Sequence, residues 1–372
     1  MQRVFIEMNL LLVFIFALCL QPVQAQSDIH LKVLGQAVIP YNYSYKNTPV
    51  GGLSGLTYDQ KSGDFYVISD DRSQKAAARF YTVKVHLNKK GRLENGGIRF
   101  VGMHRLHMRD GKTYPKGRID PEGITIGPDD FIYVSSEGVP GKDVAPFIDG
   151  YSKDGTFARA LTIPNAFWSP GGNHSRHGVR SNLAFESLTA TPDSKTIYAA
   201  TENALLQDGP AADSTHSSPA RIIMYDLPSG NILHEYQYNV DPVHLNAHSH
   251  GSFMINGLSD LLALDNKGDL LALERNFVAK QGFRISLYEV STRNATDIKG
   301  VNSIKQYNRP IRPVKKRLIA HLSKYNIAID NFEGLALGPS LPGGGRLLLM
   351  VSDNNFLPIQ RTLFTAFALH RH

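Results

Sequence analysis

Short runs of alternating apolar and polar residues recur along the chain, in pairs joined by turn residues. Within residues 118–138, Glu122 opens a run containing Ile124 and Ile126, a Gly-Pro-Asp-Asp turn follows, and a second run ends at Glu137. A period of two predicts strands, and the Gly, Pro and Asp residues between them predict a hairpin. Because the start of one antiparallel strand lies beside the end of its partner, we expect Glu122 and Glu137 at the same end of this hairpin.

The paired pattern occurs five times. Aligned on equivalent positions, the repeats are marked by Ser54, Glu122, Glu186, Ser259 and Glu333, at intervals of 68, 64, 73 and 74 residues. Two further strand-like runs follow most of these hairpins, and no convincing helical period occurs beyond the N-terminal segment. A repeated unit of this kind predicts an all-β protein, a β-propeller of four-stranded blades. The count is five blades, or six if the insertion Thr292–Lys316 contains another.

The last repeat predicts how the propeller closes. Only Leu363–Leu369 follows its hairpin, so this blade lacks an outer strand. The first apolar run after the N-terminal segment, Ile29–Ile39, is available to fill that place. Pairing the N-terminal strand with the C-terminal blade would cover open strand edges, which otherwise favour aggregation.

The first 25 residues resemble a signal peptide. Arg3 precedes an apolar run of 11 residues, Leu10–Leu20, and Val-Gln-Ala at 23–25 fits a cleavage site. The run is shorter than a membrane-spanning helix requires, although an uncleaved anchor is the alternative. We therefore expect a signal peptide at residues 1–25, cleavage before Gln26, a propeller domain at 26–372 and no stable membrane insertion after cleavage. The single cysteine, Cys19, lies in the leader, so the exported chain has no disulfide, which favours a bacterial periplasm or exterior.

Two rings of acids are expected to converge at one face of the propeller, where the inner strands begin and the second strands end. The first ring comprises Glu122, Glu186, Asp260 and Glu333, and the second comprises Asp70, Glu137, Glu202, Glu274 and Asp353. Close carboxylates repel one another unless cations compensate them, and calcium accepts several oxygen ligands without a fixed geometry. Alternatively, acids of the second ring hold neighbouring turns. Candidate metal ligands are Glu122, Glu186, Asp260, Glu333, Glu137, Glu202 and Asp353.

Basic residues near these acids are candidates for binding an anion. Formal net charge is +7, which favours anionic partners, but no Lys/Arg run is longer than three residues and no nucleic-acid partner is expected. The candidate substrate-binding residues are Arg72, Arg118, Arg180, Arg275, His174 and His177. The last two lie in the Gly-rich segment 168–180, which reads equally well as a phosphate-binding loop or as a solvated connection.

Three motifs resemble those of the family described as "esterase-like activity of phytase". They are Asp-Pro-Glu-Gly-Ile at 120–124, Asn-Leu-Ala-Phe-Glu-Ser-Leu at 182–188 and Asp-Asn-Phe-Glu-Gly-Leu at 330–335. The resemblance spans roughly residues 50–369 and implies an exported protein with a phytase-like propeller. In alkaline β-propeller phytases, calcium ions in an acidic channel mouth bind substrate phosphates and activate water. The resemblance thus implies a related reaction class. The glutamates of the first ring, Glu122, Glu186 and Glu333, are the candidate catalytic residues.

Two functions remain open at the level of sequence. One is calcium-dependent hydrolysis of a small anionic or phosphorylated substrate outside the cytoplasm. The other is a non-catalytic propeller that binds a ligand or a partner of the cell envelope, its acids being structural. The asymmetry of the first ring, with Ser54 where three repeats have Glu, favours hydrolysis, because a purely structural acid should recur in every blade.

Overall fold

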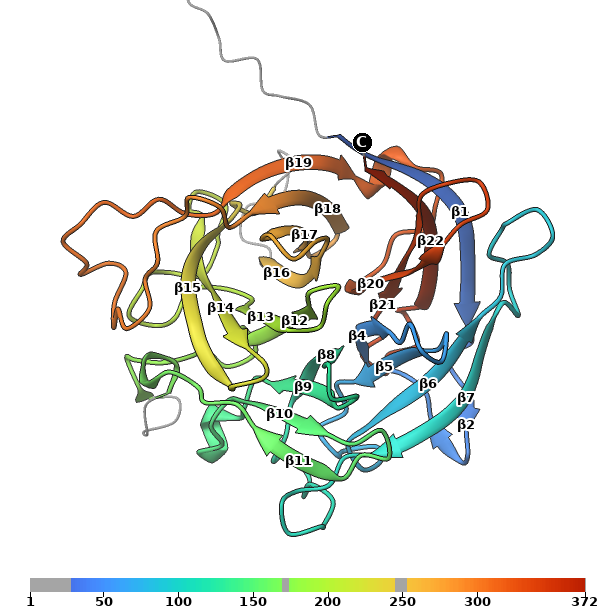
Figure 1. The fold of residues 1–372 in the computed structure, drawn as a ribbon, viewed down its shortest axis with the longest axis horizontal. Coiled ribbons are helices and arrows are strands. Elements are labelled where there is room, and N and C mark those ends of the chain that lie inside the picture. The colour runs from blue at the N-terminus through green and yellow to red at the C-terminus, as the bar shows by residue number, and fades with distance from the viewer. Residues whose placement is uncertain (1–27, 169–173, 245–252, 372) are drawn as a thin grey trace, which may run out of the picture.

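The computed structural model describes residues 28–168, 174–244 and 253–371, and it is a β-propeller of five four-stranded antiparallel blades (Figure 1). From the channel outwards, the first blade contains β4 (Leu53–Tyr58), β5 (Phe65–Ser69), β6 (Arg79–Val85) and β7 (Ile98–Arg105). The second contains β8 (Pro121–Ile126), β9 (Ile132–Ser136), β10 (Phe147–Tyr151) and β11 (Phe157–Ala160). The third contains β12 (Phe185–Ala190), β13 (Thr196–Thr201), β14 (Ser218–Asp226) and β15 (Asn231–Val240).

The fourth blade contains β16 (Met254–Ala263), β17 (Asp269–Val278), β18 (Gly282–Ser291) and β19 (Lys315–His321). The fifth contains β20 (Phe332–Ser340), β21 (Arg346–Ser352), β22 (Thr362–Arg371) and β1 (Ile29–Ile39). A small hairpin, β2 (Ser44–Tyr45) and β3 (Thr48–Pro49), precedes the first blade. The count of five is confirmed, because the insertion between β18 and β19 runs as turns and loop and forms no blade in the described chain.

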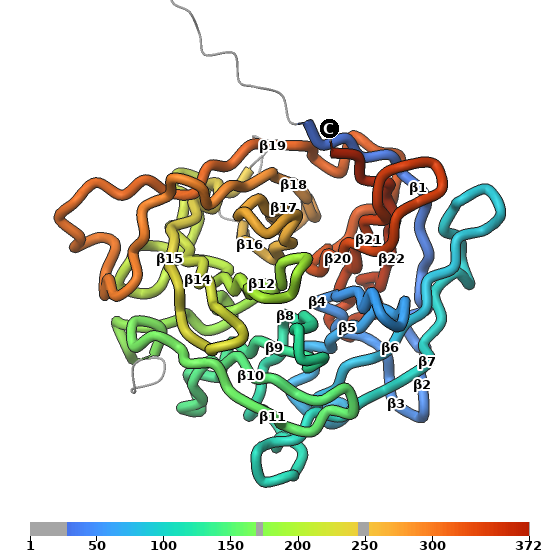
Figure 2. Tube along the Cα trace, in the orientation of Figure 1, coloured from blue at the N-terminus to red at the C-terminus, as the bar shows by residue number. Residues whose placement is uncertain are grey.

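The closure predicted from the sequence is confirmed. β1 pairs antiparallel with β22 from Ile29 opposite Arg371 to Ile39 opposite Thr362. In the trace, the blue N-terminal strand lies beside the red C-terminal one (Figure 2). β1 thereby covers the edge of β22 and completes the fifth blade with a strand from the other end of the chain, as the edge-strand argument requires.

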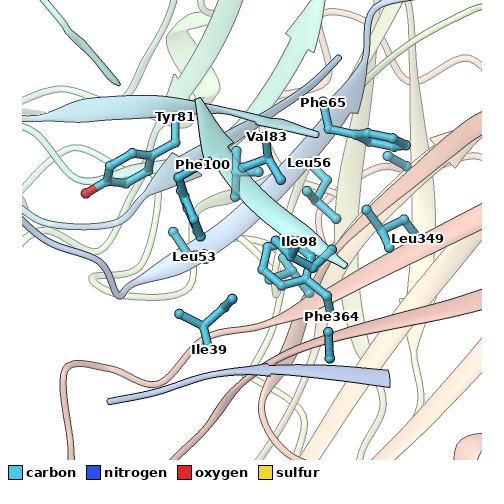
Figure 3. Close-up of a cluster of buried hydrophobic side chains, with 14 of the residues drawn as sticks. Ile39, Leu53, Leu56, Phe65, Tyr81, Val83, Ile98, Phe100, Leu349 and Phe364 are labelled. Atoms are coloured by element: carbon cyan, nitrogen blue, oxygen red, sulfur yellow. The ribbon is translucent and has the colours of Figure 1, made fainter. Parts of the chain in front are cut away.

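Apolar residues pack between neighbouring blades rather than within single ones. One cluster joins the first and fifth blades through Leu56, Phe65, Leu349 and Phe364 (Figure 3). Four further clusters fill the other blade interfaces. The five inner strands β4, β8, β12, β16 and β20 contact one another around the channel and are almost wholly buried, whereas outer strands such as β7 alternate between buried and exposed residues. Each blade therefore depends on its neighbours for its core.

The described helices are short 3-10 turns. They are η1 (Pro140–Lys142), η2 (Asn165–Phe167) and η4 (Leu322–Lys324). Within the described ranges, no helix has both the length and the apolar character needed to cross a membrane. The predicted signal peptide at residues 1–25, including Cys19, lies outside the described residues.

Candidate metal and anion site at the channel mouth

A β-bulge interrupts the inner strand of every blade at the same place. The pairing register shifts at Ser54, at Glu122 and its neighbour Gly123, at Glu186, at Ser259 and at Glu333. A bulge leaves one residue unpaired and re-aims its side chain. The three glutamates line or adjoin one cavity of about 470 Å³ at the channel mouth. In the other two blades, the serine hydroxyls instead donate to backbone carbonyls, Ser54 to Glu122 at 2.9 Å and Ser259 to Phe332 at 3.4 Å.

A second set of side chains follows the end of the second strand of each blade. The backbone N–H groups of these side chains' residues donate to the carbonyl oxygen of the residue two positions before the bulge. The pairs are Asp70 with Gly52, Glu137 with Asp120, Glu202 with Ala184, and Asp353 with Asn331. In the fourth blade this place belongs to Arg275, which pairs with Gly257. The second ring therefore contains four acids and one arginine.

Glu274, which the sequence analysis placed in the second ring, lies elsewhere. Glu274 lies opposite Leu258 in the pairing of β16 with β17, one residue before Arg275 along β17. Its carboxylate accepts hydrogen bonds from Tyr238 at 2.8 Å and from Lys316 at 2.6 Å. These partners belong to the third and fourth blades. Glu274 therefore links those two blades at a place away from the channel. The sequence alignment missed this because it matched the acids of the repeats rather than counting from the bulge.

Two glycines make room for acids of the second ring. A Cβ atom on Gly52 would lie 1.9 Å from Oδ1 of Asp70, and one on Gly257 would lie 2.0 Å from Oε1 of Glu202. The second blade has Asp120 at this same position, two residues before Glu122. Its side chain therefore adds a carboxylate to the mouth where two other blades have only space.

Asp120 completes the tightest group of acids. Oxygens of Asp120, Glu122 and Glu137 all lie within 4.8 Å of one another, and all three residues are buried. The sequence analysis did not propose Asp120 as a ligand. Its position two residues before Glu122, where other repeats have Gly, Ala or Asn, was the signal available.

We call the following eight residues the mouth acids, since mutual repulsion or shared arginines connect them: Asp70, Asp120, Glu122, Glu137, Glu186, Glu202, Glu333 and Asp353.

Burial and mutual repulsion raise the pKa values of these acids. Burial, with the charges of Glu186 and Asp120, raises the pKa of Glu122 well above its usual range. Burial and the charge of Glu333 raise the pKa of Asp70 to about 8. Burial also raises the pKa of Asp120 to about 6 against the opposing effect of Arg72, and that of Glu202 to about 7 against Arg275. The mouth therefore retains protons near neutral pH unless a cation replaces them.

Two arginines contact the mouth acids, Arg72 from the first blade and Arg275 from the fourth. Arg72 donates from Nε to Asp120 at 2.5 Å and from Nη2 to Asn182 at 2.6 Å. Arg275 donates from Nη2 to Glu202 at 3.0 Å, and its Nη1 lies 3.4 Å from Glu333. Burial alone would lower the pKa of Arg275, but the neighbouring carboxylates raise it overall, so it stays charged.

The mouth acids fit a hard cation. Glu202 and Asp353 are each only 1% exposed, and Oε2 of Glu202 and Oδ2 of Asp353 have no hydrogen-bond partner in the described structure. Unpartnered buried carboxylate oxygens are costly. Calcium takes about six to eight oxygen ligands from carboxylates, carbonyls and water, and this donor set is all oxygen. Asp120, Glu122 and Glu137 are the residues best placed to hold such an ion.

Asp260 is separate from the mouth cavity. It follows the bulge residue Ser259, at the place of Gly55, Gly123 and Gly334 in other repeats. Its carboxylate accepts the backbone N–H groups of Leu335 at 2.7 Å and Leu261 at 2.8 Å. Asp260 therefore ties inner strands of adjacent blades together.

Four of the proposed substrate-binding residues also lie outside the lining of this cavity. Arg118 is exposed and donates to the carbonyl of Lys142 at 2.7 Å. Arg180 donates to the carbonyls of Ala204 and Gly209 and holds a loop of the third blade. His174 is exposed and His177 half-buried, while residues 169–173 of the same loop lie outside the described chain.

Comparisons with other proteins identify the family of this chain. The phytase-like family, described as esterase-like activity of phytase, matches residues 48–356. A protein of Arthroderma benhamiae, described as an uncharacterized secreted protein, is 26% identical over 143 residues. That match spans 33% of this chain and only 27% of the relative.

Solved structures match this chain with low TM-scores and little sequence identity. An endo-arabinase from Bacteroides thetaiotaomicron has a TM-score of 0.43 at 10% identity, covering 89% of this chain and 96% of its own. Luciferin-regenerating enzyme has a TM-score of 0.37 at 10% identity, covering 89% and 94%. The matching family region contains all eight mouth acids and both arginines, and the chain belongs to the phytase-like family described by esterase-like activity of phytase.

Proposed function

We propose that this protein is an exported hydrolase of small anionic esters, specifically phosphoric esters, and that it depends on calcium bound at the channel mouth. The observation that carries the proposal is the imbalance of charge there. Eight mouth acids share the two arginines Arg72 and Arg275, and oxygens of Glu202 and Asp353 have no partner among the described residues. A cation would supply the missing positive charge and also attract a phosphate group.

The proposed ligands divide the mouth into two parts. Asp120, Glu122 and Glu137 would hold calcium, with Glu186 and Glu333 beside them. When bound, calcium would polarise the phosphoryl oxygens and lower the pKa of water. Arg72 and Arg275 would bind the substrate phosphate through charge-assisted hydrogen bonds.

Hydrolysis then requires a proton acceptor and a proton donor. We assign the acceptor to Glu186, which lines the mouth cavity. Burial, with repulsion from Glu202 and Glu137, raises the pKa of Glu186 well above the usual range. Calcium bound beside it would leave this carboxylate ionised and able to accept a proton. Water adds its oxygen to phosphorus, and the bond from phosphorus to the alcohol oxygen breaks. The proton taken from water passes to the departing alcohol, so the products are inorganic phosphate and the free alcohol.

Phosphate release measured with and without calcium tests this proposal. The purified exported protein is assayed on phytate and on a simple phosphomonoester, in calcium and in a calcium chelator. We expect calcium-dependent phosphate release that falls on the order of a hundredfold in Arg72→Met, as for loss of a charged transition-state contact. Arg118→Met is the matched control and should retain activity, because Arg118 does not line the cavity. Calcium and phosphate binding without turnover would instead indicate a binding propeller.

We also propose export with cleavage before Gln26. Residues 1–25 have the charged, apolar and small-residue segments of a signal peptide, and the relative from Arthroderma benhamiae is described as secreted. Mass spectrometry of the exported protein should give a chain that begins at Gln26. An intact leader, or a lipid on Cys19, would contradict this.

A further inference from the structure

A second cavity, of about 750 Å³, adjoins the channel mouth. It shares Asn182, Arg275, Asn355 and Leu357 with the mouth cavity. Its other lining residues include a group of apolar side chains together with five polar ones, Glu202, Gln281, Asp330, Asn331 and Gln360. We call the following six side chains the apolar shelf: Phe253, Ile255, Phe277, Phe283, Leu357 and Ile359.

The shelf is built from two blades. Phe277 at the end of β17 and Phe283 at the start of β18 pack with ring centroids 4.8 Å apart. Leu357 and Ile359 come from the connection between β21 and β22 in the fifth blade. Three of the seven exposed large apolar side chains in the described chain belong to the shelf, including Ile359 at 86% exposure. Scattered exposed apolar residues are ordinary, but a group beside a charged cavity indicates a binding surface.

Arg275 lies where the two cavities meet. Two of its nitrogens bind Asn331 and Glu202, while its Nε is buried and has no hydrogen-bond partner among the described residues. A ligand anion near Arg275 would therefore place the rest of the ligand either among the mouth acids or over the shelf. An apolar group is stable only over the shelf, because the mouth is lined by charged groups.

We propose that the preferred substrates are amphipathic esters, in which a phosphate at the mouth carries an apolar, ring-sized alcohol group that packs on the apolar shelf. This inference rests on the proposed function and narrows its substrate class. A compact polyanion such as phytate would leave the shelf exposed.

Binding of two phosphonates tests the inference without turnover, since neither ligand has an ester bond to the phosphorus that can be hydrolysed. Phenylphosphonate and methylphosphonate have the same head group and differ in the apolar group. Their dissociation constants are measured by calorimetry with the exported protein in calcium. We expect phenylphosphonate to bind on the order of tenfold more tightly, as for burial of part of a phenyl ring.

Variants test whether the apolar shelf causes the difference in affinity between the two phosphonates. The double variant Leu357→Ser, Ile359→Ser should reduce the ratio to about threefold or less, because it removes much of the apolar contact. Leu318→Ser on β19 is the matched control, since Leu318 is 43% exposed and Leu357 is 45% exposed. The control should leave the ratio unchanged.

The outcomes separate this inference from the proposed function. Equal affinities in the parent protein would overturn the inference and leave phosphoric ester hydrolysis standing. Failure of both phosphonates to bind would overturn the proposed function and the inference together. Self-association that the double variant abolishes, with no change in the ratio of affinities, would show that the shelf binds a second copy and would also overturn the inference.

Discussion

The two ends of the propeller channel both carry acids, but cations compensate the acids of one end more fully than those of the other. At the end where the inner strands finish, a cavity of about 340 Å³ is lined in part by Asp59, Lys61 and Asp130. Lys153 Nζ lies 2.8 Å from Asp59, and Lys61 Nζ lies 2.9 Å from Asp130. Burial raises the pKa of Asp59, but the hydrogen bonds from Lys153 and from the amide of Lys61 outweigh it and lower the pKa overall.

In the described part of the chain, the mouth has two arginines, Arg72 and Arg275, in ion pairs with its eight acids, and Lys75 also lines its cavity. Its pKa values shift upward, to about 8 for Asp70 and about 7 for Glu202. We call the end of the channel where the inner strands finish, marked by Asp59, Lys61 and Asp130, the turn end. There each lysine contacts an acid of a neighbouring blade, Lys153 from the second blade and Lys61 from the first. Acids at the turn end are thus explained by the fold alone. The mouth acids are not, and this difference is the physical reason to assign them to ligand binding.

Removing Arg275 should have the largest effect. Arg275→Gln leaves Glu202 and Glu333 without their cation, and breaking a buried pair costs about 3–5 kcal/mol. We expect a loss of unfolding free energy near the lower figure at pH 8 and a smaller loss at pH 5, where the carboxyl groups are protonated. Urea unfolding at both pH values measures it. A loss equal at both pH values would mean that charge at the mouth is not the cause.

Calcium should stabilise the protein through the mouth and not through the turn end. At a free concentration about a hundredfold above the dissociation constant, the gain is about 2.7 kcal/mol. Glu122→Gln should lose more than half of that gain, while its metal-free form keeps or gains stability because one repelling charge is removed. Melting curves with and without calcium measure both.

Glu235→Gln is the matched control for that experiment. Glu235 is buried and pairs with Arg221 at 3.2 Å, away from the mouth. It should lower stability and leave the calcium response intact. If Glu122→Gln behaved like Glu235→Gln, the mouth glutamates would be structural acceptors only.

The stability of the metal-free protein should fall as pH rises from about 4 to 8. The folded pKa values of Asp120, Glu202 and Asp70, about 6, 7 and 8, exceed unfolded values near 4, so the folded state binds more protons. Their contribution is complete below the unfolded pKa and is lost as pH passes through the folded pKa.

Urea unfolding across this range provides the measurement, and saturating calcium should flatten the slope. Asp59 behaves oppositely, because its lowered pKa gives a contribution present above pH 4 and lost in more acidic solution. A metal-free stability that rises between pH 5 and 8 would contradict the picture of protonated mouth acids.

The smallest effect is expected at the turn end. Lys153→Gln removes the partner of Asp59, but the Lys153 side chain is 36% exposed, so solvent screens the pair. We expect a loss of about 1 kcal/mol or less and no change in the calcium response. A loss as large as that of Arg275→Gln would remove the distinction between the two ends.

The sequence by itself determined the repeating part of the protein. Alternating runs and turn residues recur at nearly even intervals, and they predict the hairpins, the five blades and the pairing of Ile29–Ile39 with the last blade. These features follow from local alternation and from the need to cover strand edges. The positions of Glu122, Glu186 and Glu333 within the repeat also come from sequence, because each occupies the same place in its hairpin.

Only the tertiary structure decided which side chains share the mouth. A bulge adds one residue to the inner strand, so alignment of acids alone could not distinguish Glu274 from Arg275 or separate Asp260 from the glutamates. Asp120 joins the site because the second blade has a carboxylate where Gly52 and Gly257 leave space. The apolar shelf combines strands of the fourth blade with a connection of the fifth. Its members come from segments about 80 residues apart, and such proximity depends on how blades pack around the ring, which no local pattern encodes.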